Sequence, residues 1–142
     1  MKTKTALVFW VLSLAAPAFA QDFGTIGAFQ TPSGNIHCLA FKNSVTNEVN
    51  LRCDMKRNTA QIPPKPANCE FDWGNYFEMN AVGKANRKCV GDTVIGDYAV
   101  LPYGKKWVIE AAFSCNVSRS RLRCVNTNNH GFELAVKKQK LF

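Results

Sequence analysis

The sequence predicts an all-β protein, a small antiparallel sandwich or barrel stapled by three disulfides, and three observations support this fold class. Apolar residues alternate with polar ones over short runs, as in strands with one buried face. Turn-forming Gly, Pro, Asn and Asp residues separate these runs, and no helical stripe is longer than three turns. Six cysteines in 142 residues indicate a disulfide framework. A short helix near either end would also fit.

The first twenty residues have the pattern of a secretory signal peptide. Lys2 and Lys4 precede an apolar run at residues 6–16, and small residues end the segment. Eleven apolar residues are too few to span a bilayer core of about 30 Å, which favours a removed signal over an anchor. We therefore expect residues 1–20 to be cleaved and residues 21–142 to form a single disulfide-bonded β domain that is periplasmic or secreted.

The first element of the mature chain is a turn at residues 31–35, which begins a hairpin. Alternating runs surround Cys38 and Cys53 and predict two antiparallel strands. Pairing the two cysteines across the hairpin sets Ala40 against Leu51 on one face.

A Pro-rich connection follows at residues 55–68, and we expect an extended run on the surface. Beyond it, Cys69 alternates in phase with Phe71 and Trp73, and a turn at residues 80–83 precedes the next cysteine. This pattern predicts another hairpin closed by a disulfide.

Between Gly and Pro turns in residues 91–104 we expect short strands. The run from Trp107 to Cys115 alternates as a strand, and the chain returns through Cys124 after a polar turn. A final strand follows over residues 132–136, and a Lys-rich tail ends the chain.

The cysteine spacing favours structural disulfides over a metal site. No two cysteines have the short separation of a zinc or redox motif, and no cofactor motif is present, so we expect neither metal nor cofactor. Spacing alone leaves several pairings open, but the strand pattern favours Cys38–Cys53, Cys69–Cys89 and Cys115–Cys124.

Short motifs follow one another along the mature chain: PSGNIHC at residues 32–38, LRCD at 51–54, CVGDTV at 89–94, LPYG at 101–104, FSC at 113–115, LRC at 122–124 and HGF at 130–132. In this order the chain resembles a family of small secreted bacterial proteins catalogued only as a domain of unknown function. The resemblance implies an exported, disulfide-bonded bacterial domain and supplies no catalytic residue. His37 and Asn129 stand where Gly is more common in that family.

The two histidines are the main catalytic candidates. His37 and His130 would serve as base and acid in a ribonuclease-like hydrolase, with a cation such as Arg52 on the phosphate. We favour the simpler interpretation, in which one is a strand residue and the other a turn residue.

Paired carboxylates also raise metal or glycosidase chemistry, but we favour structural roles for Asp54, Asp72, Asp92 and Asp97. Asp92 and Asp97 follow glycines, so we expect them to cap their own turns.

Three arginines spaced two residues apart would point to the strand face opposite Leu122 and Cys124. The resulting cationic stripe could bind an anionic envelope polymer, a lipid head group or an acidic protein, whereas nucleic acid is not the expected partner. A solvated face that keeps the protein soluble is the alternative. The predicted stripe comprises Arg119, Arg121, Arg123, Lys105 and Lys106, with Lys137, Lys138 and Lys140 nearby.

A non-catalytic binding or envelope-associated module is thus the favoured function, and whether the protein is an enzyme stays open. One alternative is a small secreted hydrolase. Another is an inhibitor or immunity-type protein that inserts its Pro-rich loop, residues 61–68, into another protein. We expect Trp73 and Trp107 in the core and Tyr103 on the surface. The sequence predicts no oligomeric state.

Overall fold

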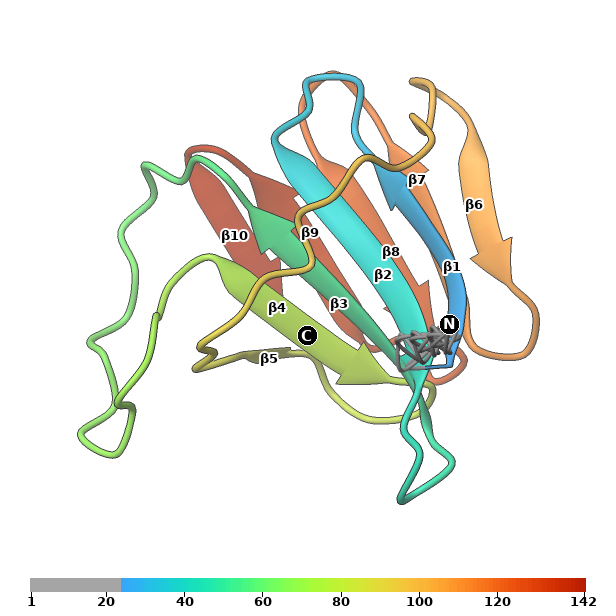
Figure 1. Cartoon of the computed structure of the whole chain (residues 1–142). Helices are drawn as coiled ribbons and strands as arrows, with labels where there is room; N and C mark the ends of the chain where they lie inside the picture. The colour runs from blue at the N-terminus through green and yellow to red at the C-terminus, as the bar shows by residue number, and fades with distance from the viewer. Residues whose placement is uncertain (1–23) are drawn as a thin grey trace, which may run out of the picture.

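The computed structural model describes residues 24–142, and the expected signal peptide at residues 1–20 lies outside them. Ten strands form two antiparallel five-stranded sheets whose inner faces share one core (Figure 1). The all-β prediction is confirmed, and the described residues contain no helix. Accordingly, nothing in residues 24–142 is a helix suited to crossing a membrane.

Each sheet is a simple meander in which strands adjacent in sequence are neighbours. The first sheet contains β1 (Thr25–Gln30), β2 (Ile36–Lys42), β3 (Val49–Met55), β4 (Tyr76–Asn80) and β5 (Asn86–Arg87). The second contains β6 (Lys106–Ile109), β7 (Phe113–Val117), β8 (Leu122–Asn126), β9 (Gly131–Ala135) and β10 (Lys138–Leu141).

The first predicted hairpin is confirmed in its register. Pairing of β2 with β3 sets Cys38 opposite Cys53 and Ala40 opposite Leu51. The two cysteines form a disulfide with their Cα atoms 4.1 Å apart. All four side chains are buried, so this inner face holds the register that the alternation predicted.

The second hairpin, β7–β8, repeats this arrangement. Cys115 lies opposite Cys124 and forms a disulfide with it, again with the Cα atoms 4.1 Å apart. Val117 lies opposite Leu122, as predicted, and both are buried. Each sheet therefore carries one cross-strand disulfide in the core.

The run from Trp107 to Cys115, predicted as one strand, is two strands joined by a tight turn. Ala111 has a φ of 56°, and the backbone N–H of Ala112 donates to the carbonyl of Ile109 at 3.1 Å. Apolar residues keep their alternation across this turn, so their pattern alone does not reveal it.

The third predicted disulfide, Cys69–Cys89, is confirmed, but it does not close a hairpin. Its Cα atoms are 5.7 Å apart, and neither cysteine belongs to a strand. It links the loop after β3 to the segment after β5. Only Asp72 and Val90 pair beside it, as an isolated bridge.

The predicted division of the aromatic residues between core and surface holds for Tyr103 but not for Trp73. Trp107 is half-buried against the core, with its ring 4.9 Å from that of Phe29. Trp73 lies outside the core, contrary to expectation. Its indole N–H donates to the carbonyl of Pro63 in the Pro-rich loop at 3.0 Å. Tyr103 is exposed, as predicted.

Residues 88–101, where we expected further strands, form an irregular strap. It runs across the outer face of the first sheet, in front of β4, β3 and β2 (Figure 1). Only isolated bridges occur in it, at Val90 and Val100. The strap covers polar side chains that the period-two pattern places on the outside of β2 and β3.

A buried ion pair on the outer face of β3 fastens the strap. Arg52 donates to both carboxylate oxygens of Asp54 (2.9 and 3.0 Å) and to the Asp92 carboxylate (2.7 Å). Asp54 also accepts from the Thr93 hydroxyl at 3.0 Å and the Val94 backbone N–H at 2.9 Å. Burial alone would lower the pKa of Arg52, but these carboxylates raise it. Asp92, expected to cap its own turn, binds Arg52 instead.

We expect Asp54→Asn to lower the free energy of unfolding by about 3 kcal/mol, since it leaves a buried guanidinium without its buried partner and with only the exposed Asp92 carboxylate. Asp92→Asn removes the other carboxylate from the same guanidinium, but that side chain is 81% exposed. Its loss should cost less than about 1 kcal/mol. Urea unfolding followed by tryptophan fluorescence measures the stability of both variants. Equal losses of unfolding free energy would contradict the Arg52–Asp54 pair as the contact that holds the strap.

Candidate functional site

His37 lies beneath the strap and is only 2% exposed. Its Nε2 is 3.1 Å from the carbonyl oxygen of Gly34, and the backbone N–H of Gly96 donates to Nδ1 at 3.4 Å. The Tyr98 ring lies 6.1 Å away. Both ring nitrogens are thus occupied, which gives His37 a structural role in seating the strap.

His130 belongs to the turn between β8 and β9 in the second sheet. Its backbone N–H donates to Asn126 Oδ1 at 3.1 Å. Asn129 before it has a φ of 60°, in the left-handed region that Gly and Asn tolerate best, which explains Asn at this position. Because the two histidines lie on different sheets, and one is covered, the arrangement lends no support to the ribonuclease-like pair, which stays a prediction.

A row of polar and charged residues crosses the outer face of the second sheet. The strand register aligns Lys106 with Asn116, Asn116 with Arg123, Arg123 with Glu133, and Glu133 with Lys140. Neighbouring strands in a sheet lie about 4.8 Å apart. The row therefore brings charges from four of the five strands close together, with the neutral Asn116 of β7 between them.

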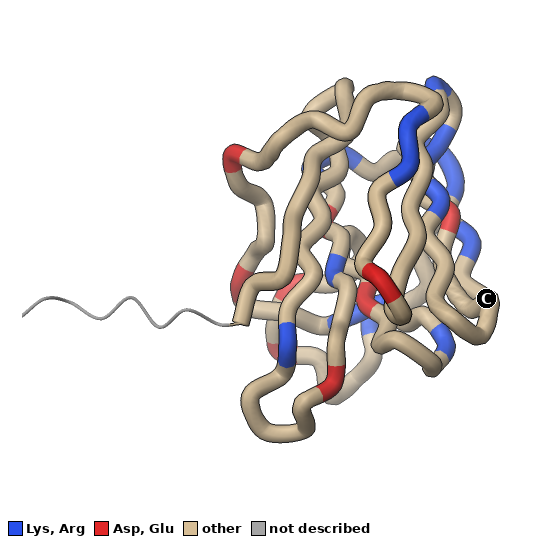
Figure 2. Tube along the Cα trace, turned by 90° about the vertical axis from the view of Figure 1, so that its right-hand side faces the viewer, with Lys and Arg blue, Asp and Glu red and all other residues tan. Residues whose placement is uncertain are grey.

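Five cations and one carboxylate form what we call the cationic face. Glu133 is the only acidic residue in the strands of the second sheet. Figure 2 shows this excess of positive charge as blue segments, with one red segment among them, along one side of the molecule. Lys105 lies just before β6 and is exposed. The face comprises Lys106, Arg121, Arg123, Lys138 and Lys140 around Glu133.

Glu133 holds two of these arginines in place. Arg123 Nη1 donates to Glu133 Oε1 at 2.6 Å, and Arg121 Nε lies 3.5 Å from Oε2. The hydrogen bond from Arg123, with the charges of Arg121 and Lys140, lowers the pKa of Glu133 despite partial desolvation. Arg123 also lies over the ring of Phe142, 4.8 Å from its centre.

Arg119 does not join this face, contrary to the predicted stripe. Residues 118–121 form a tight turn in which the Ser118 N–H donates to the Arg121 carbonyl at 2.9 Å, and the turn breaks the two-residue alternation. The guanidinium of Arg119 lies over the Tyr103 ring instead, 5.0 Å from its centre. No carboxylate in the described part of the chain is within ion-pair distance of it.

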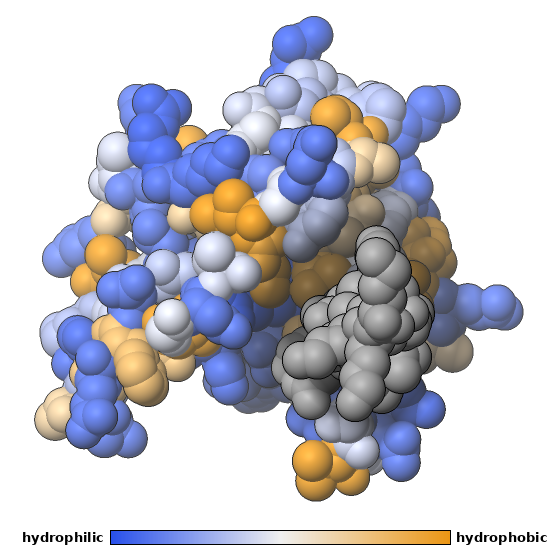
Figure 3. Space-filling model, viewed as in Figure 1, coloured by the Kyte–Doolittle hydropathy of each residue, from blue (hydrophilic) through white to orange (hydrophobic). Residues whose placement is uncertain are grey.

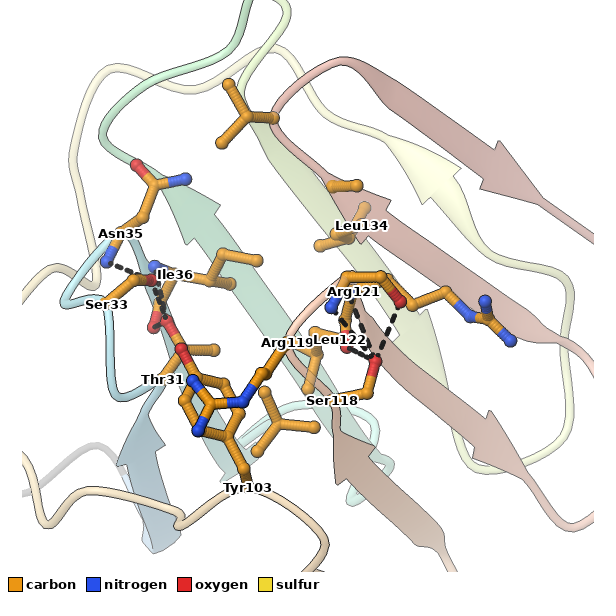
Figure 4. Close-up of a pocket in the computed structure, with 14 residues that line it drawn as sticks. Thr31, Ser33, Asn35, Ile36, Tyr103, Ser118, Arg119, Arg121, Leu122 and Leu134 are labelled. Atoms are coloured by element: carbon orange, nitrogen blue, oxygen red, sulfur yellow. Dashed lines mark hydrogen bonds between the residues drawn. The ribbon is translucent and has the colours of Figure 1, made fainter.

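Two hollows adjoin the turn that carries Arg119. The first, which we call the end hollow, has a volume of about 140 Å³ and lies between the ends of the two sheets (Figure 4). The second has a volume of about 370 Å³ and lies on the cationic face. Ser120, Arg121 and Ala135 line both, so the end hollow and the face meet along one wall.

These features define a class: a two-sheet, disulfide-bonded β protein with one sheet face covered by a strap and the other rich in cations. The chain belongs to a family of unknown function (DUF6636), whose model matches residues 6–142. This confirms the expected membership of a family without an assigned activity. Comparison with curated proteins and with solved structures finds no match. The three disulfides indicate an oxidising, extracytoplasmic environment.

Sequence reasoning missed the Arg52–Asp54 pair. One signal was available, since the two opposite charges alternate with inward-facing Leu51, Cys53 and Met55 and so share the other face of the strand. The end hollow had no comparable signal, because its lining comes from four separate segments of the chain.

We expect the Glu133 carboxyl to titrate below its ordinary pKa of 4.5 and Arg123→Gln to raise that pKa again. A lowered folded-state pKa means that this contact stabilises the protein at neutral pH, and the stabilisation is lost as pH falls from 4.5 through the folded-state value. Carboxyl ¹³C NMR titration measures both proteins. Lys106→Gln, in the same row, is the control and should leave the titration unchanged. An unchanged Glu133 pKa in Arg123→Gln would rule out that hydrogen bond as its main cause.

Proposed function

We propose that this protein is an exported, non-catalytic binding module, periplasmic or secreted, whose cationic face binds an anionic polymer of the cell envelope. One observation carries the proposal: five cations surround a single carboxylate on one sheet face. Along a strand, side chains on one face recur about every 7 Å, and across strands about every 5 Å. A chain of phosphates or carboxylates can therefore contact several of these cations at once.

The contact with Glu133 does not exhaust the arginines. Each guanidinium has five N–H donors, and the contacts with Glu133 use one nitrogen of Arg123 and one of Arg121. The remaining donors are free to bind an additional anion bidentately. Exposed ion pairs contribute little to folding stability, so this charge arrangement is better explained by binding than by stability.

We expect binding of a fluorescent polyphosphate chain, the probe, to fall steeply with salt. About five contacts give a slope near −3.5 when the logarithm of the association constant is plotted against the logarithm of the salt concentration. The double variant Lys138→Gln/Lys140→Gln should reduce the slope by about 1 to 2 and weaken binding by about tenfold, because each lysine releases a counterion when it contacts phosphate. Fluorescence anisotropy measures both, on exported protein whose mass corresponds to residues 21–142.

The matched control is Lys42→Gln/Lys56→Gln, which removes the same charge from the first sheet. It should bind polyphosphate almost as the unaltered protein does. If both pairs weaken binding equally, net charge alone is responsible and the cationic face is not a site. Salt-independent binding would exclude an electrostatic contact altogether.

A second candidate function, an inhibitor-type contact, is favoured by the exposed Pro-rich loop at residues 61–68. Every residue in it is exposed, and neighbouring Phe71 is 59% exposed. Figure 3 shows apolar atoms, tan and orange, beside blue ones at the lower left, where the loop projects. The Cys69–Cys89 disulfide and the hydrogen bond from Trp73 to Pro63 hold its base.

The loop's own sequence restrains it further. Ile62, Pro63 and Lys65 each precede a proline, which disfavours helical backbone and leaves extended or polyproline conformations. A loop that is ordered before binding loses less entropy on binding, as an inhibitory loop requires.

A photoreactive residue in place of Lys65 should crosslink to one discrete protein in the exporting bacterium. The same residue at Val45, an equally accessible hairpin tip, should not. Adding Cys69→Ser/Cys89→Ser should abolish the adduct, because the loop then loses its restraint. Adducts of the same mass from both positions, or from neither, would remove the inhibitor hypothesis.

A further inference from the structure

The end hollow opens to solvent and lies above the hydrophobic core. It lies where the β1–β2, β7–β8 and β9–β10 turns meet the turn that carries Tyr103. Its floor consists of the partly exposed Ala135 and Val136 and of underlying core side chains that are at most 5% exposed, namely Ile36, Val117, Leu122 and Leu134. A group that enters the hollow therefore contacts Ala135 and Val136 above the core, between the ends of the two sheets (Figure 4).

The size of the hollow limits what it can hold. An apolar cavity of about 150 Å³ accommodates a benzene molecule, and the end hollow has about 140 Å³. An apolar group of roughly six carbon atoms is the largest that fits without separating the sheets. Burial of that group against the floor is favourable, because each methylene removed from water contributes to the affinity.

The rim contributes one group that is free to bind an ion. The hydroxyls of Thr31 and Ser33 lie 3.1 Å apart, and those of Ser118 and Ser120 lie 3.0 Å apart, so these hydroxyls bind each other. Arg119 lies at the mouth over Tyr103, without a carboxylate partner among residues 24–142.

The neighbouring arginine has a different role. In Figure 4 the side chain of Arg121 points away from the end hollow, while that of Arg119 lies across its edge beside Thr31. Arg121 is paired with Glu133. The mouth of the end hollow therefore presents an unpaired guanidinium directly beside an apolar floor.

We propose that the end hollow binds an anionic amphiphile, with a short apolar group on Ala135 and Val136 and a phosphate or carboxylate on Arg119. The apolar floor selects the chain and its length, and the guanidinium selects the charge of the head. This site is distinct from the cationic face and does not depend on polymer binding there.

Alkyl phosphates of increasing length test the floor. From ethyl through butyl to hexyl phosphate, affinity should rise by up to about fourfold for each methylene that becomes buried. It should then level off at decyl phosphate, because the hollow is full. Methyl NMR should show shifts of Ala135 and Val136, and smaller ones of the underlying Leu134, with hexyl phosphate and none with inorganic phosphate. Affinity that is independent of chain length, or that still rises to decyl, would overturn the assignment.

Arg119→Gln tests the head, with Arg123→Gln as the matched control on the same hairpin. Hexyl phosphate should bind about tenfold more weakly to Arg119→Gln, which loses a charge-assisted hydrogen bond, and unchanged to Arg123→Gln. Hexanol should bind both variants and the unaltered protein equally, which also shows that the hollow is intact. Equal weakening in both arginine variants, or none, would contradict Arg119 as the anion ligand.

Two additional measurements distinguish the head group that binds and the site that binds it. Hexanoate in place of hexyl phosphate distinguishes a carboxylate head from a phosphate head. Lys138→Gln/Lys140→Gln should leave hexyl phosphate binding unchanged while it weakens polyphosphate binding. The binding proposals for the end hollow and for the cationic face can thus be refuted independently. Loss of hexyl phosphate binding in this lysine variant would show that the two are one site.

Discussion

The cross-strand disulfides Cys38–Cys53 and Cys115–Cys124 constrain which residues of each sheet face inward. Both cystines lie in the shared core, and each sits between strands whose inner residues are apolar. A slip of one residue in either hairpin would exchange the inner and outer faces, so a covalent link between opposed positions excludes it. The outward direction of Arg52 and Asp54 on β3 and of Arg123 on β8 follows from this constraint.

The two outer faces are used differently. On the first sheet, Arg52 and Asp54 are covered by the strap and satisfy one another, so their removal would leave a buried charge. On the second sheet, Arg123 and Glu133 stay accessible and retain free donors. The same residue chemistry thus contributes to stability where it is covered, and we propose that it contributes to binding where it is open.

The β7–β8 turn connects the two binding surfaces that we propose. Because the turn at residues 118–121 interrupts the strand alternation, Arg119 and Arg121 point to different surroundings although they are two residues apart. One guanidinium stands at the end hollow and the other at the cationic face. Residues 118–121 of this turn line the end hollow.

Local pattern was sufficient for the β2–β3 and β7–β8 hairpins, their register and their disulfides, because period-two alternation and short strand connections relate residues that are near in sequence. The Cys69–Cys89 pair was also predicted, but the hairpin expected around it is not formed. Local pattern also placed Tyr103 outside and Arg123 on the outer face. Three features needed the assembled fold: the Ala111 turn, which keeps the apolar alternation; the strap, whose Asp92 meets Arg52 from 40 residues away; and the end hollow. Contacts between distant turns depend on how two sheets stack, and no residue pattern within one strand records that stacking.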